Sequence, residues 1–176
     1  LLQTMKKAGC WNLFYGFEAG DQQLLENIGK GMSLETIRQA ARWTREAGIE
    51  VRASFMLALP GETPELARKT ISFAIELDPD YAQFCITTPY PGTRLWKEAE
   101  QYGRLTKDFR EYHCWAPVFV PFGYRDGNEI LKMERLAVRQ FYCRPAFVLK
   151  CLRKIHSWED VVRYVKGLRM LMGFLR

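Results

Sequence analysis

The sequence predicts an α/β fold in which parallel strands alternate with helices. Three segments are apolar along their length and turn polar only where each ends: FYGFEAG (14–20), FMLALPGET (55–63) and FCITTPYPGT (84–93). Nearly continuous apolar strands are typical of parallel sheets that are covered by helices. In parallel β/α folds the loops that follow the strands build the active site. These observations indicate a piece of an enzyme barrel.

The first two strands belong to a repeated unit. MKKAGCWNLFYGFE (5–18) and TREAGIEVRASFML (44–57) both run from a helix end, through Ala-Gly, into an apolar strand. Gly9 and Gly48 stand where a residue in the left-handed conformation caps a helix. A third strand is expected at about residues 81–88. The order strand, helix, strand, helix, strand predicts right-handed parallel crossovers.

The helices between the strands have marked ends. Ser33 is a predicted N-cap, and Thr63 with Pro64 marks the start of a helix over 64–77. Asp78-Pro79-Asp80 ends that helix, because the residue before proline disfavours helical geometry. Gly92-Thr93 opens a further helix to about Tyr102.

The pattern changes after residue 104, which divides the chain into a barrel part (1–104) and a C-terminal extension (105–176). Residues 105–123 are predicted to be an irregular loop across the barrel mouth. Residues 128–155 predict a helix broken at Arg144-Pro145, and Ser157 starts another helix.

Alternation along the strands separates two faces of the predicted sheet. One face is apolar and packs under helices: Leu13, Tyr15, Phe17, Val51, Phe55, Leu57, Phe84 and Ile86. The other carries polar side chains among small residues: Glu18, Arg52, Ser54, Gln83 and Thr87. Unpaired charges inside a barrel are costly, so this pattern predicts either a bound ligand or an internal ion pair between Glu18 and Arg52.

Charge is unevenly distributed along the chain. Residues 1–124 hold 14 Lys/Arg and 15 Asp/Glu, whereas residues 125–176 hold 12 and 5. The basic tail has two interpretations: helices that cap the barrel with solvated charges, or an amphipathic helix that contacts a membrane surface. No signal-peptide pattern and no long uncharged apolar stretch occurs, so we expect a cytoplasmic protein. The barrel part is not basic, which argues against nucleic acid as a partner.

The five cysteines predict no metal site in this chain. They form no C-x-x-C pair, and only two histidines accompany them. Their odd number and wide spacing fit reduced thiols.

Four stretches together resemble the second half of a radical S-adenosylmethionine (SAM) domain, in the subfamily with an upstream cobalamin-binding domain. They are YGFEAGDQQLL (15–25), FMLALPGETPE (55–65), DYAQFCITTPYPGTRLW (80–96) and FYCRPAFVLKCL (141–152). The resemblance implies the second half of a partial (β/α)6 TIM-like barrel, containing its last three parallel strands, followed by a mainly α-helical extension.

The resemblance also implies a chemistry. In that family a 4Fe-4S cluster, held by a C-x-x-x-C-x-x-C loop, cleaves SAM, and the resulting radical abstracts hydrogen from the substrate. This chain lacks the motif, so we expect the cluster ligands and the cobalamin domain upstream. The implied reaction is cobalamin-dependent methylation or ring modification of an unactivated carbon in a small-molecule or lipid-like substrate. The alternatives are a radical SAM enzyme without cobalamin, methylthiotransferase-like or oxidase-like, and a non-catalytic membrane- or protein-binding module that retains half a barrel.

Roles carry over by position, although none identifies a catalytic residue. Glu18 ends the first strand where the family places a polar contact to the ribose of SAM, and a carboxylate can accept from both hydroxyls. Ala58 stands where the family usually has glycine, and Glu62 is expected to cap the helix that begins at Pro64. Thr88 and Tyr90 are expected on the substrate-side loop, with Tyr90 a wall residue rather than an acid. The predicted cofactor-binding set is Glu18, Arg52, Ser54, Met56, Leu57, Leu59, Gln83 and Thr87.

Overall fold

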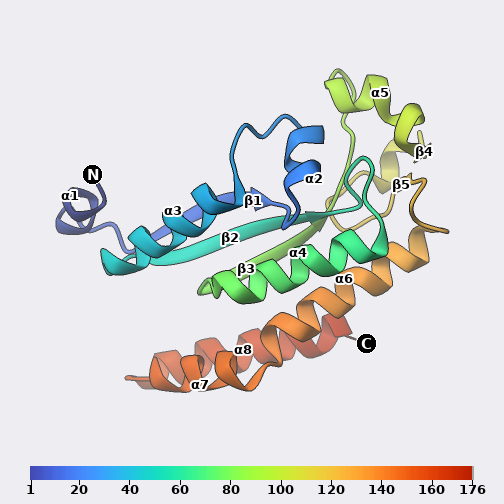
Figure 1. Ribbon diagram of the computed structural model, residues 1–176. Helices are drawn as coiled ribbons and strands as arrows, with labels where there is room; N and C mark the ends of the chain where they lie inside the picture. Colours follow the sequence, from blue (N-terminus) through green and yellow to red (C-terminus); the bar gives the residue numbers. More distant parts are fainter. Residues whose placement is uncertain (176) are drawn as a thin grey trace.

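A parallel sheet of three strands forms the centre of the molecule (Figure 1). The structure is a computed structural model that describes residues 1–175, apart from the side chains of Met170 and Leu175. Strands β1 (Asn12–Glu18), β2 (Glu50–Leu57) and β3 (Tyr81–Ile86) lie side by side in chain order. Helices α3 (Leu34–Glu46) and α4 (Pro64–Leu77) connect them. The α/β fold with three parallel strands is therefore confirmed.

The ends of these helices follow the predicted capping residues. The Ser33 hydroxyl accepts a hydrogen bond from the Thr36 amide at 3.1 Å, and the Thr63 hydroxyl accepts one from the Leu66 amide at 3.4 Å. Helix α4 ends at Asp78, which adopts a left-handed φ of 45° before Pro79. Each cap satisfies backbone groups that the helix itself leaves without partners.

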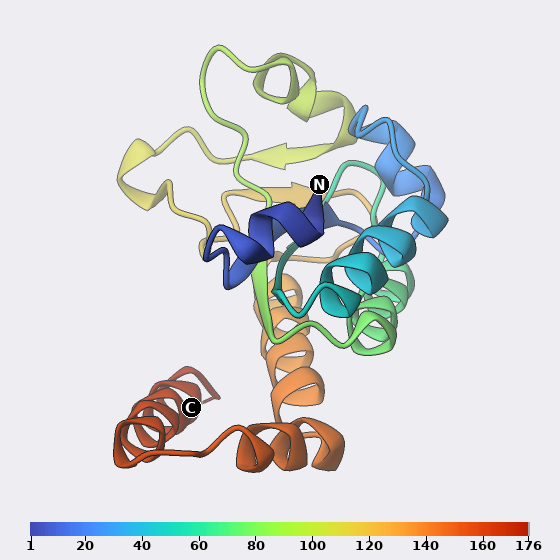
Figure 2. The ribbon, with the colours of Figure 1, turned by 90° about the vertical axis from the view of Figure 1, so that its left-hand side faces the viewer.

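The core lies between the sheet and three helices, α3, α4 and α6 (Gly127–Tyr142). In β2 the residues Val51, Ala53, Phe55 and Leu57 are completely buried, while their neighbours in sequence are only half-buried. Figure 2 shows α3 and α4 together on one side of the strands. The predicted apolar face is less deeply buried in β1, because β1 has a neighbouring strand on one side only.

Helix α6 covers the outer edge of β3. The Tyr142 hydroxyl donates to the Ala82 carbonyl at 2.6 Å and accepts from the Ala82 amide at 3.2 Å. Farther along the same edge, the Cys114 carbonyl accepts from the Ile86 amide at 2.7 Å. Side chain and loop thus satisfy backbone groups that an exposed edge strand would offer to another chain.

The segment that was predicted to be an irregular loop contains a small second sheet. After α5 (Arg94–Tyr102), strand β4 (Gly103–Leu105) pairs antiparallel with β5 (Phe119–Pro121), and a short 3-10 helix (Phe109–Glu111) lies between them. The strands approach so closely that a Cβ added to Gly103 would lie 2.3 Å from the Val120 carbonyl oxygen. Strands of three residues carry no clear alternation, which explains why the pattern did not reveal them.

The C-terminal extension is helical, as predicted, and its break lies at Pro145. Helix α6 is followed by α7 (Pro145–Arg153) and α8 (Trp158–Leu175). Two short helices, α1 (Leu2–Lys7) and α2 (Gln22–Asn27), precede α3. None of the described helices combines the length and the apolar character needed to cross a bilayer.

Ion pairs fasten α7 beneath the amino-terminal ends of β2 and β3. Lys154 lies 2.6 Å from Glu50 and 2.9 Å from Asp80. Lys150 lies 3.2 Å from both Asp78 and Asp80. Arg144 also pairs with Asp78. These three basic residues of the tail are therefore partnered by carboxylates of the barrel part rather than simply solvated.

Candidate functional site

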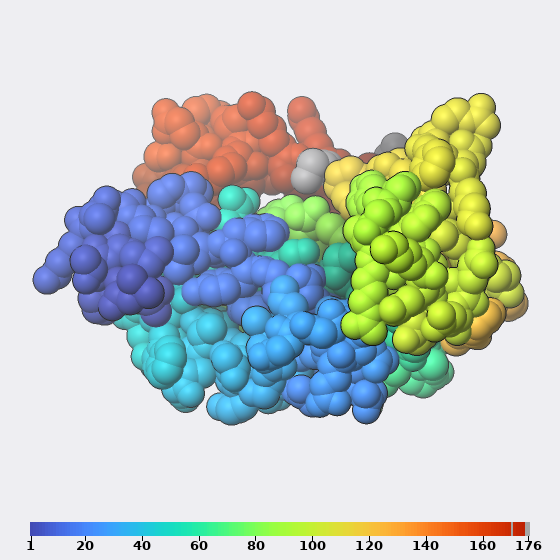
Figure 3. Space-filling view, turned by 90° about the horizontal axis from the view of Figure 1, so that it is seen from above, coloured from blue at the N-terminus to red at the C-terminus, as the bar shows by residue number. Residues whose placement is uncertain are grey.

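The face of the sheet opposite α3 and α4 carries the predicted polar row, and we call it the open face. Cross-strand pairing places Phe14, Arg52 and Tyr81 in one row, then Gly16, Ser54 and Gln83, then Met56 and Cys85. Residues paired in this way share one side of a sheet. Figure 3 shows a recess above the strands, bounded by the N-terminal segment (blue), the tail (red) and α5 with its loops (yellow-green).

Glu18 joins the open face through an irregularity at the end of β1. The pairing register shifts between Gly16 and Glu18, and Glu18 adopts a φ of 64°. A Cβ added to Gly16 would lie 2.5 Å from the Glu18 Oε1 atom. The carboxylate therefore folds back over Gly16, on the side that Ser54 and Gln83 also face.

Lys30 is the partner of Glu18, which the sequence reasoning missed. Its Nζ donates to Glu18 Oε1 at 2.9 Å. The alternative ion pair between Glu18 and Arg52 is not formed. The Arg52 guanidinium instead lies 4.8 Å from the centre of the Tyr81 ring, a cation–π distance. Arg52 forms no ion pair among residues 1–175, so its charge remains available on the open face.

The loop after β2 is strained at Ala58, which has a φ of 60°. Glu18 and Ala58 thus end two adjacent strands in a conformation that L-residues rarely adopt. Such strain persists only where the surrounding structure enforces it, and it gathers at functional sites. It also explains the family's glycine at this position, since glycine adopts positive φ without a steric penalty.

Glu62 holds the loop at Ala58 in this strained conformation. The expectation that Glu62 caps α4 is wrong. Its Oε1 atom accepts from the Ala58 amide and from the Tyr124 hydroxyl, both at 2.6 Å. Thr63 caps α4 instead. The Glu62 side chain is completely buried, and burial raises its pKa to about 7 despite the hydrogen bonds from Tyr124 and Ala58. Glu62 therefore links the loop after β2 to the loop after β5.

Not every predicted cofactor-binding residue lies on the open face. Leu57 points into the core with Val51, Ala53 and Phe55, and Leu59 is buried too. Thr87 is also buried, and both its amide and its hydroxyl donate to the Leu57 carbonyl at 2.9 Å. These side chains hold the ends of β2 and β3 together. Met56, near the end of β2, has its side chain on the open face.

The two predicted substrate-side residues belong to the loops beyond β3. The Thr88 hydroxyl donates to the His113 carbonyl at 3.2 Å. Tyr90 is half exposed and packs edge-on against Tyr112, with ring centres 6.1 Å apart. Phe109 and Trp96 complete an aromatic cluster with Tyr112. Tyr90 therefore belongs to an aromatic cluster that sequence reasoning missed.

The described residues do not offer ligands for a metal cluster. Within residues 1–175, no three His, Cys, Asp or Glu side chains gather where they could hold a metal ion. The cysteines carry no disulfide, and they range from buried Cys85 to exposed Cys143. Burial and the neighbouring Cys114 thiol raise the pKa of Cys85 to about 12, so it remains a thiol.

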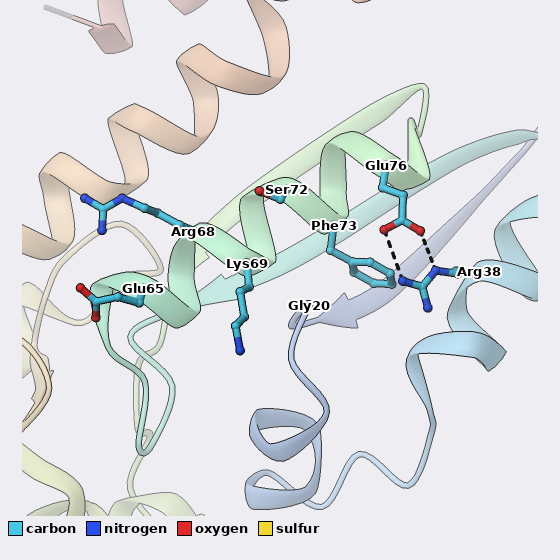
Figure 4. A pocket seen from close by; sticks show the side chains of 8 residues that line it. All are labelled: Gly20, Arg38, Glu65, Arg68, Lys69, Ser72, Phe73 and Glu76. Carbon is cyan, nitrogen blue, oxygen red and sulfur yellow. Dashed lines mark hydrogen bonds and ion pairs between the residues drawn. The ribbon is translucent and has the colours of Figure 1, made fainter.

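A second hollow, on the helix side, is a less suitable site. Figure 4 shows it between α3 and α4. Three of its charged side chains already have partners: Arg38 lies 2.6 Å from Glu76, and Lys69 lies 3.0 Å from Asp21. It also lies across the sheet from the open face, away from Glu18.

The strain at Ala58 leads to a first prediction. Ala58→Gly should raise the free energy of unfolding by about 0.5–1 kcal/mol, because relief of the left-handed penalty exceeds the extra chain entropy of glycine. Ala99→Gly, inside helix α5 and also buried, is the control and should lower it by about 1 kcal/mol or more. Urea unfolding of the full-length protein measures both. A destabilising Ala58→Gly would show that the conformation is not strained.

The buried Glu62 carboxyl should make the free energy of unfolding depend on pH. Its folded pKa of about 7 lies above the ordinary glutamate value of 4.5, so its contribution is complete below pH 4.5 and is lost as the pH rises through 7. The expected loss is up to about 3 kcal/mol, at 1.36 kcal/mol for each pKa unit. Buried Glu134, with a pKa raised to about 7 by burial, acts in the same direction. Urea unfolding of Glu62→Gln should show a flatter pH profile, and an unchanged profile would contradict the assignment.

Comparison with known proteins agrees with this geometry. The Radical SAM superfamily profile matches residues 1–74. An uncharacterized methyltransferase of Pyrococcus horikoshii is 36% identical over 94% of this chain and 36% of its own length. The anaerobic magnesium-protoporphyrin IX monomethyl ester cyclase of Rubrivivax gelatinosus is 29% identical over 84% of this chain and 26% of its own length. The chain thus spans about a third or less of these relatives.

One similar solved structure is the radical SAM methyltransferase TsrM from Kitasatospora setae, determined with cobalamin and a [4Fe-4S] cluster bound. It is 27% identical, with a TM-score of 0.51 over 57% of this chain and 19% of that chain. The sequence matches and the shared fold agree: this chain belongs to the radical SAM superfamily.

Proposed function

We propose that this chain is the SAM-binding half of a radical SAM enzyme that modifies an unactivated carbon. The observation that carries the proposal is the open face, where a carboxylate, a guanidinium, a hydroxyl and an amide meet beside an apolar side chain. They belong to Glu18, Arg52, Ser54, Gln83 and Met56. This set suits a molecule that joins a ribose and an apolar base to a charged amino-acid end.

Each residue has a role that its chemistry supports. The Glu18 carboxylate, held by Lys30 at 2.9 Å, accepts from the ribose hydroxyls. Met56 packs on the adenine, and its unbranched thioether adapts to a flat ring. Arg52 pairs with the carboxylate of SAM, with Ser54 and Gln83 as neutral hydrogen-bonding groups. Glu62 acts indirectly, because it fixes the loop of Ala58 through the 2.6 Å bond to the Ala58 amide.

Two further cofactors belong to the proposal. In this superfamily a bound 4Fe-4S cluster supplies the electron that cleaves SAM. Because residues 1–175 offer no ligand group for such a cluster, we place its cysteines in a part of the protein outside this chain. Cobalamin is proposed from the similarity to TsrM, and it too would be held outside these residues.

The relatives suggest the kind of reaction. Their names describe a methyltransferase and a ring-forming cyclase, so we propose methylation or ring modification of a small-molecule or lipid-like substrate. Residues 1–104 would bind the cofactor, and the extension 105–176 would close the substrate side through the aromatic cluster that contains Tyr90. We place the enzyme in the cytoplasm.

The full-length protein tests this function. After anaerobic reconstitution with iron and sulfide, and reduction, it should convert SAM to 5′-deoxyadenosine or S-adenosylhomocysteine, measured by liquid chromatography. Reconstitution with and without cobalamin separates the cobalamin-dependent reaction from its alternative. A protein that holds its cluster but consumes no SAM would refute the proposal.

A further inference from the structure

The two tail helices carry exposed large apolar side chains, and together we call them the tail surface. Its members are 36–75% exposed although all are large and apolar. Patches of this kind mark sites where a partner or a membrane binds. The tail surface consists of Val148, Leu149 and Leu152 on α7, and Trp158, Val162, Val165, Leu168 and Met172 on α8.

The outward orientation of α7 is fixed by its opposite side. Phe147 is buried against Phe141 and Tyr142, with ring centres 5.3 and 5.1 Å apart. Lys150 and Lys154 hold the barrel carboxylates described above. Because α7 is fastened along this side, Val148, Leu149 and Leu152 cannot turn inward without breaking these contacts.

Helix α8 carries its apolar residues in a stripe. Trp158, Val162, Val165 and Met172 recur at intervals of three, four and seven residues, so they lie along one side of the helix. Its other side contacts α6, yet none of its described side chains is fully buried. Figure 2 shows α8 lying apart from the sheet at the lower left. Met170, Leu175 and Arg176, which the sequence places in the same segment, lie outside the described side chains.

Basic side chains accompany the stripe. Arg153, Arg163, Lys166 and Arg169 are exposed. The acidic residues of α8 are confined to its first turn, where Asp160 accepts from the amides of His156 and Ser157. From residue 161 onward the sequence contains no Asp or Glu. Arg163 pairs with Asp160 at 2.7 Å, and Arg169 lies within the stripe, between Val165 and Met172. The tail surface is therefore apolar and carries a net positive charge.

We propose that the tail surface docks onto an anionic lipid membrane, with α8 lying in the interface. Basic amphipathic helices bind there by burying apolar side chains among headgroups while their cations meet anionic lipids. Each basic residue near such a surface adds up to about fivefold in affinity. A second copy of the chain fits less well, because a two-fold interface would bring the same basic groups face to face.

Vesicle co-sedimentation of the full-length protein tests this docking. The protein should bind phosphatidylglycerol-rich vesicles, should bind phosphatidylcholine vesicles at least tenfold more weakly, and should be released by high salt. Combined Lys166→Glu and Arg169→Glu should weaken binding by tenfold or more. Lys97→Glu, an exposed lysine on α5, is the matched control and should change nothing. Combined Val165→Ser and Met172→Ser tests the apolar contribution and should also weaken binding.

Fluorescence locates the contact. Vesicles with brominated acyl chains should quench the emission of Trp158, and the quenched fraction should fall in Trp158→Phe. Circular dichroism of each variant verifies that the fold is intact. No binding to either vesicle, equal binding to both, or binding that the tail variants leave unchanged would overturn the proposal. None of these results bears on SAM cleavage, which is assayed without lipid.

Discussion

Replacement of Glu62 by alanine should lower the free energy of unfolding by about 3–5 kcal/mol at a pH of about 5.5, where the carboxyl of the folded protein is still protonated. The substitution removes the acceptor of both the Ala58 amide and the Tyr124 hydroxyl, each bonded at 2.6 Å. It leaves these groups buried without partners beside a small cavity. Urea unfolding of the full-length protein provides the measurement.

Two variants make the result specific. Tyr124→Phe removes only one of the two bonds and should lower the free energy by about 1–2 kcal/mol. Glu65→Ala changes an exposed glutamate three residues along the chain and should stay within about 0.5 kcal/mol. A loss in Glu62→Ala no larger than in Glu65→Ala would show that the buried carboxyl does not secure the loop.

Replacement of Glu18 by alanine should weaken SAM binding by about 1–3 kcal/mol, which is the scale of lost charge-assisted hydrogen bonds. Gly16→Ala should act in the same direction although it retains the carboxylate, because its new Cβ would lie 2.5 Å from the Glu18 Oε1 atom and would displace it. Isothermal titration calorimetry of the reconstituted full-length enzyme gives both affinities.

Glu35→Ala is the matched control for this pair. Glu35 is an exposed glutamate in the first turn of α3, on the helix side of the sheet, and its loss should leave the affinity unchanged. Unchanged affinity in Glu18→Ala would assign Glu18 and Lys30 a structural role as an internal ion pair.

The strands and their faces could be predicted because strong local signals agree with the tertiary structure. Caps at Ser33 and Thr63 and the apolar alternation of β2 all predicted what the fold uses. Polar residues at even positions of β2 indicated the open face before any partner was known. At these positions secondary-structure propensity, hydrophobic pattern and tertiary packing all favour the same structure.

The remaining details depend on contacts between segments distant in sequence. Tyr124 bonds to Glu62 across 62 positions, and Tyr142 reaches Ala82 across 60, so neither pairing has a local signature. Lys30 reaches Glu18 from the turn that ends α2, where Gly29 adopts a positive φ. Leu57 was assigned to the cofactor by its position in the motif, although its place in β2 turns it into the core. Thr87 was placed on the polar face by alternation, but it is buried beyond the end of β3 and its hydroxyl bonds to the Leu57 carbonyl.

A crystal structure of the full-length enzyme with SAM tests the central claim most directly. The nucleoside should lie over the open face, with its ribose hydroxyls within hydrogen-bonding distance of the Glu18 carboxylate and its adenine against Met56. SAM bound elsewhere, with Glu18 still held by Lys30 and out of reach of the ligand, would contradict the assignment of the open face as the SAM site.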